Sequence, residues 1–179
     1  DRIGVGSSER RSRVETLLGP DAPWENPAAM MDPAQAYGGS PAASALRLEV
    51  EDLLLEFGAQ RPEWSRHSGR EAFEEAWQHA RVARALLGYH AALAHDAPDR
   101  TQRLLGQRDA LMADILAHIS RREPGRVLVF AHNRHLQLGP ATWQLGPTLL
   151  KWLPAGAHLR EEFGSTYSVV GSALFDSPE

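Results

Sequence analysis

The chain has 179 residues, of which 42% are hydrophobic and 23% are charged, and this composition is typical of a globular domain rather than a disordered chain. Its formal net charge of −4 argues against a nucleic-acid-binding protein. No apolar run approaches the roughly 20 residues of a membrane span. The absence of cysteine excludes disulfides, thiolate metal sites and a cysteine nucleophile. We therefore expect a cytoplasmic protein with neither a membrane nor a nucleic-acid partner, and we expect no particular oligomeric state.

Helical periodicity dominates residues 1–122, which we expect to form a helical portion. A first helix is predicted over Ser8–Leu18, because apolar residues recur on one face before Gly19 and Pro20. Ser40 followed by Pro41 predicts the start of a second helix, which we expect to end near Gly58. The remaining helices are expected from Ser68, as a capping box with Glu71, to about residue 94, and over residues 99–120.

A long loop separates the first two expected helices and contains Trp24, Met30 and Met31 among several prolines. Loops of this length in compact domains are usually functional or disordered. The large apolar side chains indicate that this loop packs against a surface.

The pattern changes in residues 123–179, for which we predict a βαβ portion. Residues 127–131 form a short apolar run with two β-branched members, which indicates a buried strand of a parallel sheet. Helical stretches are expected around residues 148–152 and 158–163, and a second strand over 167–170. The expected fold class is therefore α/β, mainly helical with a small parallel β part. Because two parallel strands make a poor sheet alone, and the chain begins without methionine, we expect a fragment of a larger fold.

The densest group of candidate site residues follows the first expected strand and contains His132, Asn133 and His135. Open α/β sheets bind their ligands at the carboxyl ends of strands, and a histidine there can act as an acid or base near neutral pH. Asn133 could orient the histidine or donate to an oxyanion. A structural alternative is that both histidines cap the end of the strand through backbone contacts.

Arg108 and Asp109 form a second candidate pair on the fourth expected helix, beside its apolar stripe. An arginine there could clamp a substrate carbonyl or carboxylate, whereas a structural ion pair is the simpler interpretation. The two histidines of the first group would need a third ligand to hold zinc, so we expect no metal. We also expect no cofactor.

The segment VLVFAHNRHLQ resembles the signature of the erythromycin esterase family, and so do QRDALMADIL upstream of it and FGSTYSVVG downstream. The segments WENPAAMMDPAQAYGGSP and LRLEVEDLL resemble the middle region of actinobacterial members of that family. The resemblance spans nearly the whole chain, so residues 1–179 are identified as a partial domain of this family.

The resemblance implies an α/β core with a large helical part, and a metal-independent hydrolase typified by the opening of a macrolide lactone by water. It implies that His132 and His135 act in catalysis, with His132 as an acid/base partner, and that Arg108 stabilises the developing charge. Asn133 and Asp109 are then expected to contact the substrate, a small-molecule ester or lactone. The family's HGxHE motif does not occur in this sequence, so the resemblance implies that catalysis needs residues upstream of it.

Two other functions remain open at this point. A helical module could bind a hydrophobic small molecule or a partner without chemistry, and a related hydrolase could act on a cell-envelope or polysaccharide substrate. The upstream sequence would distinguish the binding module from an esterase. A panel of substrates would distinguish the related hydrolase from an esterase.

Overall fold

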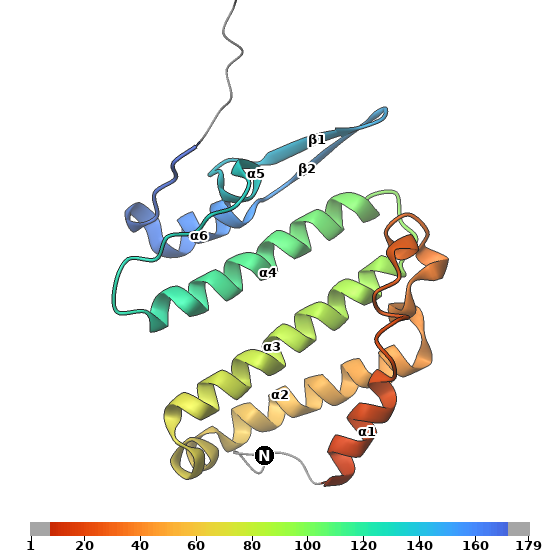
Figure 1. The fold of residues 1–179 in the computed structure, drawn as a ribbon, viewed down its shortest axis with the longest axis vertical. Coiled ribbons are helices and arrows are strands. Elements are labelled where there is room, and N and C mark those ends of the chain that lie inside the picture. Colours follow the sequence, from red (N-terminus) through yellow and green to blue (C-terminus); the bar gives the residue numbers. More distant parts are fainter. Residues whose placement is uncertain (1–7, 172–179) are drawn as a thin grey trace, which may run out of the picture. The chain divides into compact units, whose positions relative to one another are not determined.

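The computed structural model describes residues 8–171 and forms two compact units, Asp1–Arg100 and Thr101–Glu179 (Figure 1). The first unit contains three helices, α1 (Ser8–Leu18), α2 (Pro41–Ser68) and α3 (Arg70–Leu93). The second contains α4 (Arg100–Arg122), which begins at the boundary, α5 (Asn133–Leu136), β1 (Ala141–Leu145), β2 (Thr148–Trp152) and α6 (Ala155–Phe163). Short 3-10 turns are η1 (Pro27–Met30), η2 (Pro33–Gln35), η3 (Tyr37–Gly39) and η4 (Gly164–Thr166). The described part is mainly helical with one small two-stranded sheet, and none of its helices is long and apolar enough to cross a membrane.

Helices α2 and α3 form an antiparallel pair around an aromatic cluster (Figure 1). Phe57 is 3% exposed and Phe73 is fully buried, with their ring centroids 5.5 Å apart in an edge-to-face arrangement. The ring of Trp64 packs edge-on against Phe57 at 5.3 Å. These contacts explain why α2 runs ten residues past Gly58, where we expected it to end, and continues through Pro62.

The start of α2 is confirmed, because the side chain of Ser40 accepts a hydrogen bond from the backbone N–H of Ala43. The capping box expected at Ser68 is wrong. Ser68 is the last residue of α2, and its hydroxyl donates to the backbone oxygen of Trp64 at 2.6 Å. Gly69, with φ of 88°, makes the turn into α3 instead.

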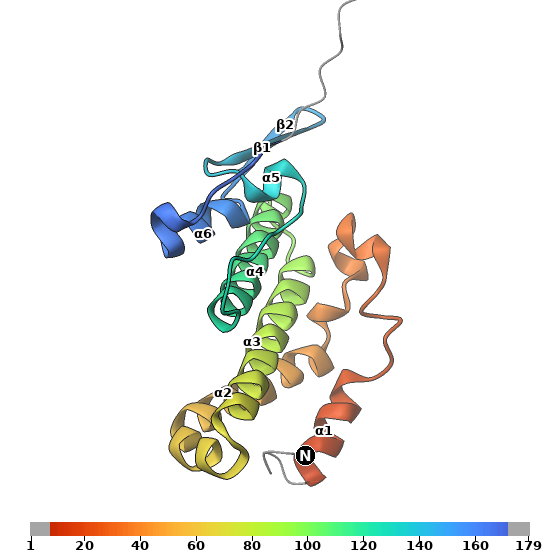
Figure 2. The same ribbon diagram turned by 60° about the vertical axis from the view of Figure 1, so that its left-hand side comes forward.

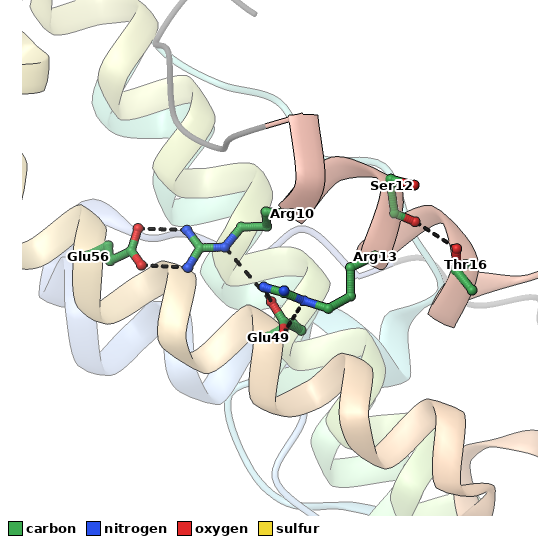
Figure 3. Close-up of polar contacts among 6 residues, drawn as sticks. All are labelled: Arg10, Ser12, Arg13, Thr16, Glu49 and Glu56. Carbon is green, nitrogen blue, oxygen red and sulfur yellow. Dashed lines mark hydrogen bonds and ion pairs between the residues drawn. The ribbon is translucent and has the colours of Figure 1, made fainter.

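Helix α1, confirmed with the bounds expected, is held on α2 by paired charges (Figure 3). The guanidinium of Arg10 donates two hydrogen bonds to the carboxylate of Glu56, at 2.6 and 2.5 Å. Arg13 pairs with Glu49 through its Nε at 2.6 Å. The hydrogen bonds from Arg10 lower the pKa of the Glu56 carboxyl below its usual value.

The loop between α1 and α2 is packed, as its large apolar residues indicated, and forms η1, η2 and η3 (orange in Figure 2). Trp24 packs with the cluster of Leu46, Val50 and Leu87, and its indole N–H donates to the backbone oxygen of Leu18 at 2.8 Å. The buried guanidinium of Arg100 donates to the backbone oxygens of Ala29, Met30 and Leu93, which ties the loop to the end of α3.

In the second unit, β1 and β2 form an antiparallel hairpin (Figure 1). Ala141 pairs with Trp152 at one end, and Leu145 pairs with Thr148 across the two-residue turn Gly146-Pro147. The φ of Gly146 is 56°, as a tight hairpin turn with glycine in its first position requires. The expected helix over 148–152 is therefore wrong, whereas the helix expected around 158–163 is confirmed as part of α6.

The expected parallel βαβ arrangement is also wrong for the described residues. Residues 127–131 and 167–170 are not strands, and the side chains of Leu128 and Phe130 are 95% and 101% exposed. A strand needs a neighbouring strand for its backbone hydrogen bonds, and no described segment supplies one to either stretch. The expected division into portions 1–122 and 123–179 stays a prediction, since both portions include residues outside those described.

Candidate functional site

Three of the five candidate residues meet in the second unit around the imidazole of His135. Arg108 and Asp109 come from α4, and His135 comes from the short helix α5. The Nδ1 atom of His135 lies 2.6 Å from Oδ1 of Asp109, and its Nε2 atom lies 3.2 Å from the guanidinium of Arg108. The structure therefore brings the RD pair of α4 together with His135 of the segment after residue 131.

The two contacts of His135 determine its tautomer. A guanidinium can only donate hydrogen bonds, so the Nε2 atom facing Arg108 must be the acceptor. The ionised carboxylate of Asp109 can only accept, so the proton lies on Nδ1. This arrangement of donors and acceptors favours the tautomer with its proton on Nδ1 and with the Nε2 lone pair on the side of Arg108, and such a nitrogen is suited to act as a base.

Asp109, His135 and Arg108 differ in how far they are buried. Asp109 is 0% exposed, the side chain of His135 is 20% exposed, and Arg108 is exposed. A buried carboxylate needs its oxygens satisfied by donors. The second oxygen of Asp109, Oδ2, accepts a hydrogen bond from the indole N–H of Trp152 in β2 at 2.6 Å. Both carboxylate oxygens of Asp109 are therefore engaged by protein groups, and the substrate contact implied by the resemblance stays a prediction.

His132 caps α5. Its Nδ1 atom accepts a hydrogen bond from the backbone N–H of Arg134 at 3.1 Å, in the N-cap position of the short helix. The ring is exposed, and its centroid lies 6.4 Å from that of His135. Asn133 is also exposed, at the first position of α5. His132 thus caps the start of a helix and not the end of a strand, which differs from the structural alternative considered from the sequence, and its ring lies beside the His135 ring.

Close packing of α6 fixes the position of α5. A side chain on Gly156 would place its Cβ atom 2.1 Å from the backbone oxygen of Leu136, so only glycine permits this approach. The hydroxyl of Tyr167 donates to the same oxygen of Leu136 at 2.9 Å, and burial raises the pKa of this phenol. His135, which precedes Leu136, is consequently held on a firmly anchored turn.

Sequence reasoning misses Trp152, because the sequence predicts a helix over residues 148–152 and no site motif lies beside the tryptophan. The available hairpin signal was the pair of short segments on either side of Gly146-Pro147, each of which contains a threonine and a tryptophan. Among the described residues, no group of three or more histidine or acidic side chains could hold a metal ion.

A search of curated proteins and a search of solved structures found no match to the chain. The family model described as erythromycin esterase matches residues 5–177, which cover most of each unit and every candidate residue. This match indicates hydrolase activity. The chain belongs to the erythromycin esterase family.

Proposed function

We propose that this protein hydrolyses a carboxylic ester or lactone of a small molecule, with His135 as the general base and Arg108 as the stabiliser of the oxyanion. The observation that supports the proposal is the partly exposed His135 imidazole, which donates through Nδ1 to the buried carboxylate of Asp109. This arrangement holds the ring in one tautomer and stabilises the imidazolium that forms when the base accepts a proton.

The reaction begins when the substrate carbonyl oxygen takes the guanidinium of Arg108 away from Nε2 of His135. Arg108 is exposed, so its side chain can turn toward a substrate without opening the core. The freed Nε2 atom then accepts a proton from a water molecule, whose oxygen forms a bond with the carbonyl carbon. Arg108 donates hydrogen bonds to the negative oxygen of the tetrahedral intermediate.

The carbon–oxygen bond to the leaving group then breaks, and the alkoxide takes a proton to give an alcohol and a carboxylic acid. The imidazolium of His135 can supply this proton, and the exposed ring of His132 is the second candidate donor. We also propose that Asn133, the exposed residue beside His132, contacts the substrate. In this scheme Asp109 is a positioning residue, because both of its oxygens are engaged by protein groups.

The test is hydrolysis of a panel of macrolides and simple esters, with mass spectrometry to detect the gain of one water. His135→Gln should lower kcat about 10²- to 10⁴-fold, as expected for loss of a general base. Arg108→Gln should lower kcat about 10²- to 10³-fold, as expected for loss of an oxyanion donor. His132→Gln should have a smaller effect, because its role is shared with His135.

His118→Gln is the matched control, since His118 lies on the same helix as Arg108, ten residues further along. It should leave turnover unchanged. Wild-type turnover by both His135→Gln and Arg108→Gln would contradict the proposed site. Tight binding of a panel member without any product would instead favour the non-catalytic binding module, and turnover of only cell-envelope glycans would favour the second alternative.

A further inference from the structure

The buried carboxylate of Asp109, which contacts His135, also accepts a hydrogen bond from Trp152. Neither the family match nor the sequence motifs single out this tryptophan. Trp152 is 8% exposed, and its indole N–H lies 2.6 Å from Oδ2 of Asp109. The other carboxylate oxygen, Oδ1, faces His135. A single carboxylate therefore joins the strand β2 to the imidazole on α5.

The orientation of an aspartate carboxylate is weakly restricted by its own torsion angle, because this terminal rotation has a broad energy well. A donor on each oxygen removes that freedom. The hydrogen bond from Trp152 holds Oδ2, so that Oδ1 stays directed at Nδ1 of His135. The orientation of the His135 ring, and the nitrogen that carries its proton, consequently depend on the position of the indole.

The indole is itself held by one face of α4. The side-chain oxygen of Gln102 accepts a hydrogen bond from the backbone N–H of Lys151 at 3.0 Å. Leu105 packs against the cluster that contains Trp152, and Gly106 lies so close to the tryptophan that a Cβ atom added to it would be in van der Waals contact with the Trp152 Cβ, at 3.8 Å. Together with Asp109, these residues stand at helix positions i, i+3, i+4 and i+7, which lie on the same side of a helix.

We propose that Trp152 is a positioning residue for His135, acting through Asp109 to keep the imidazole in the Nδ1–H tautomer with Nε2 free to accept a proton. This inference rests on the proposed function, since it assigns Trp152 a part in the same site. It also makes the β1–β2 hairpin part of the site, although its strands supply no group that reacts.

The test compares Trp152→Phe with the wild-type chain. Phenylalanine keeps an aromatic ring in the core and removes the N–H donor. The histidine side chains are labelled with ¹⁵N, and the ring nitrogens of His135 are assigned by their loss in His135→Gln. At alkaline pH, where free imidazole is neutral, the wild-type spectrum should show the Nδ1–H tautomer. Trp152→Phe should show a mixture with the Nε2–H tautomer.

Trp143→Phe is the matched control, because Trp143 is in the paired strand β1 and is 40% exposed. It should keep the wild-type tautomer. On a substrate identified by the panel, Trp152→Phe should lower kcat about tenfold with little change in KM, because molecules in which His135 has the Nε2–H tautomer lack the base.

Circular dichroism checks that Trp152→Phe folds. If it does not, Trp152 is replaced by 3-benzothienylalanine, which has the shape of tryptophan without the N–H group. An unchanged Nδ1–H tautomer in the folded variant would overturn the assignment of Trp152. The spectrum does not depend on turnover, so a chain that hydrolyses no substrate but shifts its tautomer would count against the proposed function and not against the role of Trp152.

Discussion

Adjacent residues on a helix point about 100° apart, and Arg108 and Asp109 show how much this separation changes their environments. Asp109 is directed into the contact with β2 and is fully buried, whereas Arg108 reaches solvent. Both nevertheless contact His135, one at each ring nitrogen. The site therefore combines a buried acceptor with an exposed donor on consecutive residues.

His90 has an environment that makes the folding stability of the chain depend on pH. Burial of His90 in the N-terminal unit lowers the pKa of its imidazole, and its ring packs edge-on against Trp24 at 5.1 Å. The unfolded chain therefore binds a proton near pH 6.5 that the folded chain binds only at lower pH. Stability contributed by neutral His90 is present above pH 6.5 and is lost as the pH falls below it.

We expect the urea midpoint of the wild-type chain to fall between pH 7.5 and pH 5.5, and the fall to be smaller in His90→Gln. Denaturation followed by circular dichroism at several pH values measures this. The control is His79→Gln, since His79 is an exposed residue of the same helix and should leave the pH dependence unchanged. Equal pH dependence in His90→Gln and the wild type would show that the burial of His90 has no such effect.

At the scale of elements, two close backbone approaches depend on glycine. Gly156 permits α6 to contact the backbone of α5, and Gly38 permits η3 to contact the backbone oxygen of His90. In both cases an added Cβ atom would lie 2.1 Å from a backbone oxygen, which no side-chain rotation can relieve. Gly58, in contrast, lies in the middle of α2 with open space around it.

These environments predict opposite outcomes for the same substitution. Gly156→Ala should destabilise the chain by about 1–3 kcal/mol, because the helices must separate, and should shift the ring resonances of His135. Gly58→Ala should stabilise it by roughly 0.5–1 kcal/mol, because alanine loses less backbone entropy in a helix. Urea denaturation measures both free energies of unfolding. A Gly156→Ala variant as stable as the wild type would mean that α5 and α6 do not pack as described.

At the scale of the whole molecule, each compact unit has its own buried clusters. The first unit contains the aromatic cluster around Phe73 and the aliphatic cluster around Leu46. The second contains a cluster around Ala117 and Leu159 and another around Trp152.

Residues 1–100 should therefore fold when they are produced alone. We expect a helical circular dichroism spectrum and cooperative thermal unfolding, because the segment keeps both of its clusters and the Arg100 guanidinium that ties its loop to α3. Arg100→Ala in the same segment is the comparison, and it should unfold at a lower temperature, since three backbone oxygens lose their donor. A segment that lacks cooperative unfolding would show that the first unit depends on the second.

The sequence by itself determined the features that depend on neighbouring residues. The bounds of α1, the Ser40 cap of α2 and the course of α4 follow from local patterns of apolar and capping residues. The candidate residues Arg108, Asp109 and His135 were likewise evident from their positions in recognisable motifs, as was the family to which the chain belongs.

Only the tertiary structure decided the features that depend on residues far apart in the chain. Residues 127–131 have the composition of a strand, but a strand forms only where a partner lies beside it, and the described residues pair 141–145 with 148–152 instead. The extension of α2 past Gly58 required Trp64 to reach the aromatic cluster. Asp109 contacts His135, which is 26 positions further along the chain, and Trp152, which is 43 positions further along. A pattern of neighbouring residues cannot indicate contacts over such sequence separations.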